Sequence, residues 1–236
     1  MQPLPSTDVE IICGDESWIG GKLQNKMIEL IENTIPKNIK NVGIKMSGGT
    51  DSSIAAYLIA LYSVKNNLNL NIIPITVIEE SAPFQLIFTE TVIKIINKII
   101  SANIKQPIVF NFSKGDKIKR IRKVENILFK SKTVELIVSG TTKAPKEDIG
   151  YNNTVKWPAS DDRTLDSYPY LWDNKIYTPI LNIDKKGVAK LYEEYDLVDT
   201  LFPYTRSCVS ATTDFSKHCG TCWWCKERIW AFGRLQ

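Results

Sequence analysis

The sequence lacks the features that would place the protein in a membrane or outside the cell. Its 236 residues contain no apolar run as long as the roughly 18 residues that a membrane span needs. The N-terminal residues 1–5 have neither the basic start nor the apolar centre of a secretory signal peptide. Internal repeats and low-complexity linkers are also missing. We therefore expect a cytoplasmic protein with no membrane partner.

The chain also lacks a large excess of charge of one sign. The 30 Lys and Arg residues exceed the 26 Asp and Glu residues by only four. Nucleic-acid-binding proteins instead carry a clustered basic face. The net charge by itself therefore does not indicate nucleic-acid binding, and under our lead interpretation below we expect no direct nucleic-acid partner. We expect a mildly basic protein that can bind anions such as ATP. The length suffices for one large domain, or for one domain with a small appendage.

Cysteine is present but unevenly distributed. Four of the five cysteines lie within residues 208–225, and Cys13 stands alone. A secreted disulfide framework would spread its cysteines along the chain and avoid an odd one, so this distribution also favours the cytoplasm. The clustered cysteines follow the pattern C-x10-C-x2-C-x2-C, as Cys208, Cys219, Cys222 and Cys225. Four thiolates at these spacings are typical of a structural Zn²⁺ site.

The identity of the metal is left open by this pattern, because sets of four cysteines also hold iron–sulfur clusters. The only histidine, His218, directly precedes Cys219. We interpret it as a neighbour of the site and not as a ligand, since four cysteines already fill a tetrahedral zinc site. Its ordinary pKa near neutrality keeps it a candidate for proton transfer.

Short apolar strands alternate with helices through much of the chain. This alternation predicts an α/β fold with a parallel sheet covered on both faces. The expected strands are 42–46, 72–78, 107–112, 134–138 and 176–180. The expected helices are 22–35, 52–64, 84–100, 116–129, 185–195 and a closing helix that includes Arg228, Trp230 and Phe232.

The same pattern suggests three regions. Residues 1–40 form an N-terminal extension of unknown role, residues 41–180 an ATP-binding α/β domain, and residues 181–236 a helical region with the four cysteines. Between 140 and 175 the sequence is rich in Pro, Asp, Asn and Tyr and shows no periodicity. A loop of this length inside a domain usually serves function.

The strongest functional signal is the sequence Ser-Gly-Gly-Thr-Asp-Ser at residues 47–52, between the first sheet strand and a helix. Two adjacent glycines let an anion approach the backbone closely. The free N–H groups and the dipole at the start of the following helix then complete an anion site. We expect the nucleotide to contact Met46, Ser47, Gly48, Gly49, Thr50, Asp51, Ser52 and Ser53.

Asp51 is the residue of this loop that indicates a bound metal ion. A carboxylate in a phosphate site repels the ligand unless it has a second task, such as holding a Mg²⁺ ion that bridges phosphates. The alternative is that Asp51 merely caps the helix. The Gly-Lys-Ser/Thr ending of a Walker loop is absent.

The loop resembles the PP-loop of the ATP pyrophosphatase superfamily, whose pattern Ser-Gly-Gly-x-Asp-Ser it matches in full. The resemblance implies a Rossmann-like fold similar to the adenine nucleotide alpha-hydrolases, with ATP above the carboxyl ends of the strands. It also implies that a substrate oxygen attacks the α-phosphate and that pyrophosphate leaves. Mg²⁺ and a lysine would stabilise the departing charge. Lys143, after the fourth strand, is our candidate for that lysine, and a solvated surface role is its alternative.

Both motifs together resemble the 7-cyano-7-deazaguanine synthase family. The residues that carry this likeness are Thr-Arg-Ser-Cys at 205–208, the segment 219–228 from Cys219 to Arg228, and the approach at 177–185. The resemblance implies a carbon–nitrogen ligase that adenylates 7-carboxy-7-deazaguanine with ATP and adds ammonia. The product would be 7-cyano-7-deazaguanine, for queuosine-type biosynthesis. A homodimer is left open.

The likeness does not extend to the presumed substrate pocket. After the second strand the family carries Tyr-Gly-Gln-Arg-His, where this chain has Thr-Val-Ile-Glu-Glu-Ser-Ala-Pro at 76–83. Residues 150–151 and 162–163 echo the family's Gly-Tyr and Asp-x-Arg only faintly. Three alternatives therefore stay open. They are a tRNA-modifying enzyme of the thiolation type, a related enzyme acting on another small-molecule or protein carboxylate, and a zinc-stabilised binding module without catalysis.

Overall fold

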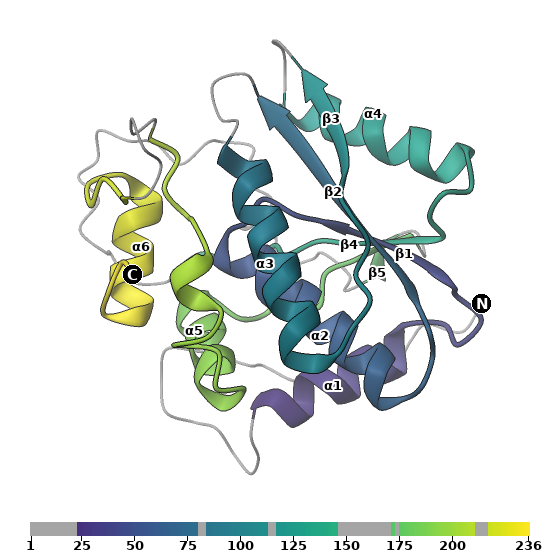
Figure 1. Cartoon of the computed structure of the whole chain (residues 1–236), viewed down its shortest axis with the longest axis horizontal. Coiled ribbons are helices and arrows are strands. Elements are labelled where there is room, and N and C mark those ends of the chain that lie inside the picture. The colour runs from purple at the N-terminus through teal and green to yellow at the C-terminus, as the bar shows by residue number, and fades with distance from the viewer. Residues whose placement is uncertain (1–22, 80–83, 113–116, 146–170, 173–174, 211–216) are drawn as a thin grey trace.

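A six-stranded sheet forms the centre of the computed structural model, which describes residues 23–79, 84–112, 117–145, 171–172, 175–210 and 217–236 (Figure 1). The strand order is β3-β2-β1-β4-β6-β5, and only the pair β5 and β6 is antiparallel. The strands are β1 (Asn41–Lys45), β2 (Asn71–Glu79), β3 (Ile108–Phe112), β4 (Leu136–Val138), β5 (Leu171–Trp172) and β6 (Ile176–Tyr177). The predicted α/β fold with a parallel sheet is confirmed.

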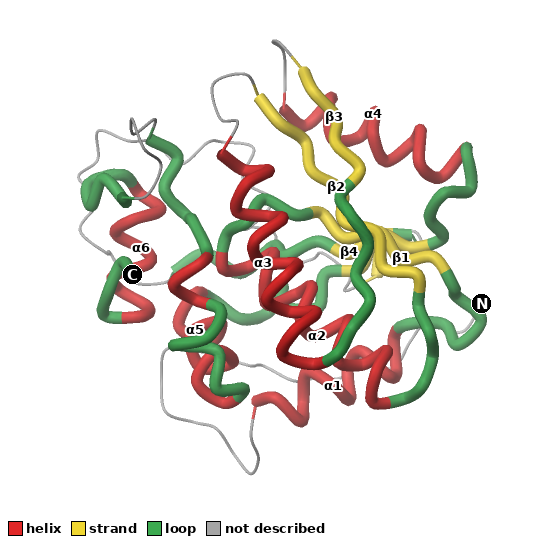
Figure 2. The backbone as a smooth tube through the Cα atoms, in the orientation of Figure 1, coloured by secondary structure: helices red, strands yellow, loops and turns green. Residues whose placement is uncertain are grey.

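Helices cover both faces of this sheet (Figure 2). They are α1 (Leu23–Thr34), α2 (Thr50–Lys65), α3 (Phe84–Ile100), α4 (Lys117–Lys130), α5 (Lys185–Glu194) and α6 (Trp223–Phe232), with the short 3₁₀ helix η2 at Phe202–Tyr204. Among the helices of the described ranges, none combines the length and apolar character needed to cross a membrane.

Side chains alternate between two separate cores along the strands. Ile73 of β2 and Ile137 of β4 pack against α4 on one face. Leu136 and Val138, the neighbours of Ile137 along β4, pack on the opposite face with α2. Strands buried on both faces must be almost continuously apolar, which is why they are visible in the sequence.

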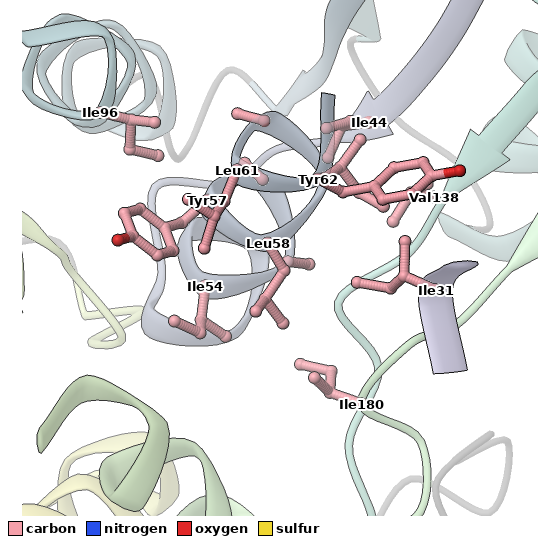
Figure 3. Packing of buried hydrophobic residues seen from close by; sticks show 14 of the residues in the cluster. Ile31, Ile44, Ile54, Tyr57, Leu58, Leu61, Tyr62, Ile96, Val138 and Ile180 are labelled. Carbon is pink, nitrogen blue, oxygen red and sulfur yellow. The ribbon is translucent and has the colours of Figure 1, made fainter. Parts of the chain in front are cut away.

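Helix α2 is buried around nearly its whole circumference. Thirteen of its sixteen residues are buried, and Figure 3 shows Ile54 and Leu58 among the side chains of Ile31, Ile96 and Ile180. Moving such a helix would open cavities, and a single buried Leu→Ala change already costs about 2–5 kcal/mol. The start of α2, which follows residues 47–49 (the glycine loop), is therefore held firmly in place.

Helix α1 belongs to the same core as α2. Its residues Leu23, Met27 and Ile31 are buried. The carboxylate of Glu194 on α5 accepts hydrogen bonds from the first N–H groups of α1, those of Leu23 at 3.2 Å and Gln24 at 2.7 Å. These bonds satisfy donors that a helix start leaves unpaired. The boundaries at residues 40 and 180 stay predictions.

The largest difference between expected and observed elements lies at β6. The sequence suggests a strand over 176–180, but β6 ends at Tyr177 and a turn follows. Pro179 explains this, because proline cannot donate to a strand ladder. Cys13, residues 150–151 and 162–163, and most of the predicted functional loop lie outside the described residues.

Glu135 links the start of β4 to β1 and should make stability depend on pH. Its carboxylate accepts the backbone N–H groups of Asn41 at 2.8 Å and Lys40 at 2.9 Å, and these bonds lower its pKa from the usual 4.5. Because the folded-state pKa is lowered, the stabilisation is present above about pH 4.5 and is lost as the pH falls through the lowered value. Glu135→Gln should lower the melting temperature by about 2 °C at pH 7, and by less at pH 3.

Thermal unfolding at both pH values checks this expectation. The exposed Glu29→Gln variant, which removes an i,i+3 pair with Lys26, serves as the control. An equal loss at pH 7 and pH 3 for Glu135→Gln would contradict an electrostatic role.

Candidate functional site

The glycine loop lies at the carboxyl end of β1, where the strand order reverses. Strand β1 pairs with β2 on one side and with β4 on the other. The chain therefore builds the sheet outward through β2 and β3, and then returns to place β4 beside β1. Such a switch point leaves a crevice outside the strand ends, and ligands of α/β proteins bind there. The backbone N–H of Met46 donates to the carbonyl of Ile75 at 2.9 Å and ties the loop's first residue to β2.

Gly48 is required by the shape of the loop. Its φ of +74° lies in the left-handed region, and an added Cβ would lie 2.4 Å from the Cβ of Phe88 on α3. Gly49 then caps α2 without a side-chain hydrogen bond. The positive end of the helix dipole is thus open to an anion that approaches the two glycines.

Two hydroxyl groups of the loop hold its shape. Ser52 and Ser53 donate to the carbonyl of Gly49, at 3.2 Å and 2.7 Å. The hydroxyl of Ser47 lies 3.3 Å from that of Ser52. The predicted residues from Met46 to Ser53 thus form one compact turn. Ser52 and Ser53 hold that turn around Gly49.

The loop after β4 touches the start of α2. A Cβ on Gly140 would lie 2.7 Å from the backbone of Asp51 and Ser52. Only glycine lets these two backbones approach so closely. The backbone N–H of Lys143 donates to Ile183 at 2.8 Å, which fixes this loop against the segment before α5. A catalytic role for the Lys143 side chain stays a prediction.

The lysine in contact with Asp51 is Lys185, the first residue of α5. Its ammonium forms a short ion pair with the Asp51 carboxylate and lies 3.4 Å from the hydroxyl of Thr50. Lys185 is only 3% exposed, and a buried ammonium needs such partners. The structure thus places a buried cation beside the loop, where a bound anion would meet it.

We did not single out Lys185 as a site residue from the sequence, although a signal for it exists. Asp184 caps α5 by accepting the N–H of Gly187 at 3.0 Å, so Lys185 occupies the first turn. A cation there opposes the helix dipole, which favours negative charge at the N-terminus. An unfavourable local position of this kind indicates that a distant partner holds the lysine.

Tyr192 joins the same helix to the phosphate loop. Its hydroxyl donates to the backbone carbonyl of Thr50 at 3.1 Å. Burial raises the pKa of Tyr192 far above its usual 10, and the nearby Asp51 adds to this effect. Tyr192 is therefore a neutral donor at any physiological pH, and it supports the first turn of α2.

Arg206 reaches the loop from the other side. Its backbone N–H donates to the carbonyl of Gly48 at 2.8 Å. Its guanidinium donates to the carbonyls of Lys217 at 2.9 Å and Ser210 at 3.0 Å, and it lies 4.9 Å from the ring centre of Phe84. The segment leading to Cys208 is therefore packed against the phosphate loop.

The four predicted cysteines come together as a compact group. Their sulfur atoms all lie within 4.8 Å of one another, with 3.8 Å between Cys219 and Cys225 and 4.0 Å between Cys222 and Cys208. Four sulfurs about 2.3 Å from a tetrahedral Zn²⁺ lie roughly 3.8 Å apart. In a [4Fe–4S] cluster each thiolate binds a different iron, which spreads the sulfurs further. The described residues therefore fit a single tetrahedral ion.

Backbone N–H groups support the cysteines as in a metal-binding turn. Cys222 donates to the sulfur of Cys219 at 3.3 Å, and Cys219 donates to that of Cys208 at 3.4 Å. Although burial raises the pKa of Cys219, hydrogen bonds to its sulfur outweigh this and lower the pKa to about 5. Burial raises the pKa of Cys225 strongly. Gly220 permits the turn with a φ of +73°.

His218 directly precedes the cysteine-cluster residue Cys219. Burial and the charges of Arg228 and Arg206 lower its pKa to about 4, so its ring is neutral at pH 7. Within the described part of the chain, neither ring nitrogen has a hydrogen-bond partner.

Arg228 connects the cysteine helix α6 to the segment before Cys208. Its fully buried guanidinium donates to the hydroxyls of Thr205 at 2.9 Å and Ser207 at 3.3 Å, and to the carbonyl of Phe202 at 3.0 Å. Burial lowers its pKa to about 10, so it remains charged. The Arg that ends the cysteine motif thus holds both cysteine-bearing segments together.

The C-terminal part of the chain is similar to a known protein family. Residues 167–236 match the family described as "Queuosine biosynthesis protein QueC". The family resemblance stated from the sequence is confirmed over this part, which includes the four cysteines, Lys185 and Arg228. A search of curated proteins finds no match.

Two of the solved structures to which this chain is similar are those of a tRNA thiolase and an NAD+ synthetase. The U34-tRNA thiolase NcsA from Methanococcus maripaludis with its [4Fe-4S] cluster is 15% identical with a TM-score of 0.49, over 81% of this chain and 68% of that chain. An NAD+ synthetase from Burkholderia pseudomallei is 10% identical with a TM-score of 0.46, over 89% of this chain and 80% of that chain. The family match and the complete phosphate-loop motif support an ATP-dependent adenylating enzyme.

Proposed function

We propose that this protein is a carbon–nitrogen ligase that converts 7-carboxy-7-deazaguanine and ammonia to 7-cyano-7-deazaguanine at the expense of ATP. The observation that carries the proposal is a complete PP-loop packed against a four-cysteine segment that matches the QueC family. The PP-loop supports attack on the α-phosphate, and the family match of the four-cysteine segment supports a deazaguanine carboxylate as the substrate.

The chain's own residues account for the handling of the triphosphate. The glycines and the start of α2 bind the β- and γ-phosphates, and Lys185 neutralises the charge that develops on pyrophosphate. Asp51 is the carboxylate placed to hold Mg²⁺, which would bridge the phosphates and stabilise the leaving group. The four cysteines would hold Zn²⁺ as a structural ion, because all four positions of a tetrahedron are filled and none is left for a substrate.

The atom balance of the reaction requires two activations. A substrate carboxylate oxygen first attacks the α-phosphate and releases pyrophosphate. Ammonia then displaces AMP, which carries away that oxygen, and an amide results. The amide oxygen must leave in the same way before the nitrile forms. Two ATP molecules are therefore consumed for each nitrile, and both oxygens of the carboxylate end in AMP.

An isotope experiment tests this scheme. The purified protein is incubated with ATP, Mg²⁺, ammonium and substrate labelled with ¹⁸O in its carboxylate. We expect the nitrile by mass spectrometry and about two labelled AMP molecules per nitrile. Intact ATP binding without any nitrile or labelled AMP would overturn the substrate assignment.

Metal analysis of the same sample separates the thiolation alternative. We expect about one zinc per chain and a colourless protein. A brown protein with iron and sulfide would instead favour a tRNA-modifying enzyme of the thiolation type. A zinc protein that forms labelled AMP only with another carboxylate would keep the ligase chemistry and change the substrate.

A further inference from the structure

Lys185 lies between two carboxylates that belong to different parts of the protein. One is Asp51 in the phosphate loop, with which it forms the short ion pair. The other is Glu227 on α6, whose carboxylate lies 3.8 Å from the same ammonium. Glu227 is fully buried and follows the cysteine-cluster residue Cys225 by two positions. The described residues thus place one buried cation within reach of two anions.

Asp51 cannot serve Lys185 and a magnesium ion equally well. If Asp51 held Mg²⁺, the divalent cation would lie next to the Lys185 ammonium and would repel it. Lys185 cannot withdraw into solvent, because its side chain is 4% exposed and packed at the start of α5. Besides the phosphates of a bound nucleotide, the carboxylate of Glu227 at 3.8 Å is then the anion within its reach.

The position and the charge of Glu227 suit it to hold the Lys185 ammonium. A buried carboxylate is costly unless a cation or several donors accompany it. The 3.8 Å separation is longer than a direct hydrogen bond and can be closed by a small movement of the flexible lysine side chain. The ammonium would then stay beside the phosphates while Asp51 is released for Mg²⁺.

We propose that Glu227 is a positioning residue that holds Lys185 when Asp51 turns to the magnesium–nucleotide complex. The proposal rests on the proposed use of ATP with Mg²⁺ and adds a role for a residue outside the phosphate loop. It also means that the helix of the cysteine cluster contributes to nucleotide binding through a defined side chain.

Glu227→Gln provides the test, with two binding measurements by calorimetry on the metal-loaded protein. At a fixed ATP concentration, the variant should show an apparent Mg²⁺ dissociation constant about tenfold higher than the wild type, because Lys185 stays on Asp51. Without added Mg²⁺, its ATP affinity should equal or exceed that of the wild type, because one negative charge near the phosphates is gone. A merely structural role would weaken both measurements together.

Glu193→Gln is the matched control, since Glu193 forms an exposed pair with Lys190 on α5. It should bind Mg²⁺ and ATP as the wild type does. If Glu227→Gln does not fold, as judged by zinc content and thermal unfolding, Glu227→Asp replaces it. Aspartate keeps the charge, but its side chain is one methylene shorter. The apparent Mg²⁺ affinity should therefore fall by a smaller factor, again without a loss of ATP affinity in the absence of Mg²⁺.

Two results would overturn the inference. One is an unchanged Mg²⁺ requirement, and the other is an equal loss of ATP affinity with and without Mg²⁺. Both leave the proposed use of ATP intact. Failure of the wild-type protein to bind ATP at all would instead overturn the proposed function.

Discussion

Replacing Asp51 with Asn is expected to lower the rate of AMP formation about a thousandfold or more. The change removes a charge at the point where the phosphate loop, the buried Lys185 and the expected magnesium ion meet. Interactions of this kind act where charge develops on the leaving pyrophosphate, and losing one such group commonly costs a hundredfold to a thousandfold. Asn also replaces a charged magnesium ligand by a neutral one, which adds to the loss.

The fold of this variant should survive. Asn has nearly the same shape as Asp, and the Asp51 side chain is 24% exposed. Lys185 would keep the hydroxyl of Thr50 at 3.4 Å and the carboxylate of Glu227 at 3.8 Å as partners. We therefore expect the variant to retain its zinc and to unfold within a few degrees of the wild type.

The measurement is the rate of AMP release at saturating ATP and Mg²⁺. Asp199→Asn is the control, because Asp199 forms an exposed pair with Arg234 far along the chain from the loop. It should be as active as the wild type. If Asp51→Asn formed AMP at a normal rate, the loop would not be catalytic, and the view of the protein as a binding module would gain support.

Much of the fold could be predicted because its signals are local. The helix over residues 84–100 has the predicted bounds, and the buried α2 starts within two residues of its predicted position. Apolar strands in a doubly covered sheet and helices with regular apolar spacing record their burial in the sequence itself. The predicted strand at 176–180 was too long because Pro179 interrupts the ladder, an effect that apolar character alone does not reveal.

The two motifs of the site were visible for the same reason. Residues 47–52 and the cysteines at 219–225 are each close together in the sequence, so the pattern of one short segment predicts one binding site. Cys208 lies further away in the sequence, but a fourth cysteine separated from the other three by ten residues still predicts a shared metal site.

The rest of the site is assembled by contacts that no local pattern records. Lys185 lies 134 residues after Asp51 in the sequence, and Tyr192 lies 142 residues after Thr50. Lys143 follows a strand end and its catalytic role stays a prediction, whereas the ion pair of Lys185 with Asp51 had no signal of this kind. The contact of Lys185 with Asp51 depends on how α5 packs against α2, and only the three-dimensional arrangement determines that.

Replacing Cys219 with Ser is expected to remove the metal and to lower the melting temperature by about 10 °C or more. A serine hydroxyl remains protonated at neutral pH and cannot replace a thiolate ligand. Structural zinc contributes on the order of 10 kcal/mol to local folding, and each kcal/mol corresponds to roughly 2–4 °C for a chain of this size. Metal analysis and thermal unfolding measure the two effects.

The loss should spread from the cysteines to the nucleotide site. Without the metal, the three remaining sulfurs no longer share an ion, and α6 is held to the segment before Cys208 chiefly by Arg228. That segment contacts Gly48 through the N–H of Arg206, and α6 carries Glu227 beside Lys185. We therefore expect ATP affinity to fall about tenfold or more in the same variant.

Cys13→Ser is the control, because Cys13 lies outside the motif of residues 208–225. It should retain about one metal ion per chain and wild-type ATP affinity. By linkage, saturating ATP should raise the metal affinity of the wild-type protein by the same factor by which the metal raises its ATP affinity. A Cys219→Ser protein that lost its metal but bound ATP normally would contradict this coupling, since the loop would then hold its shape without the cysteine region.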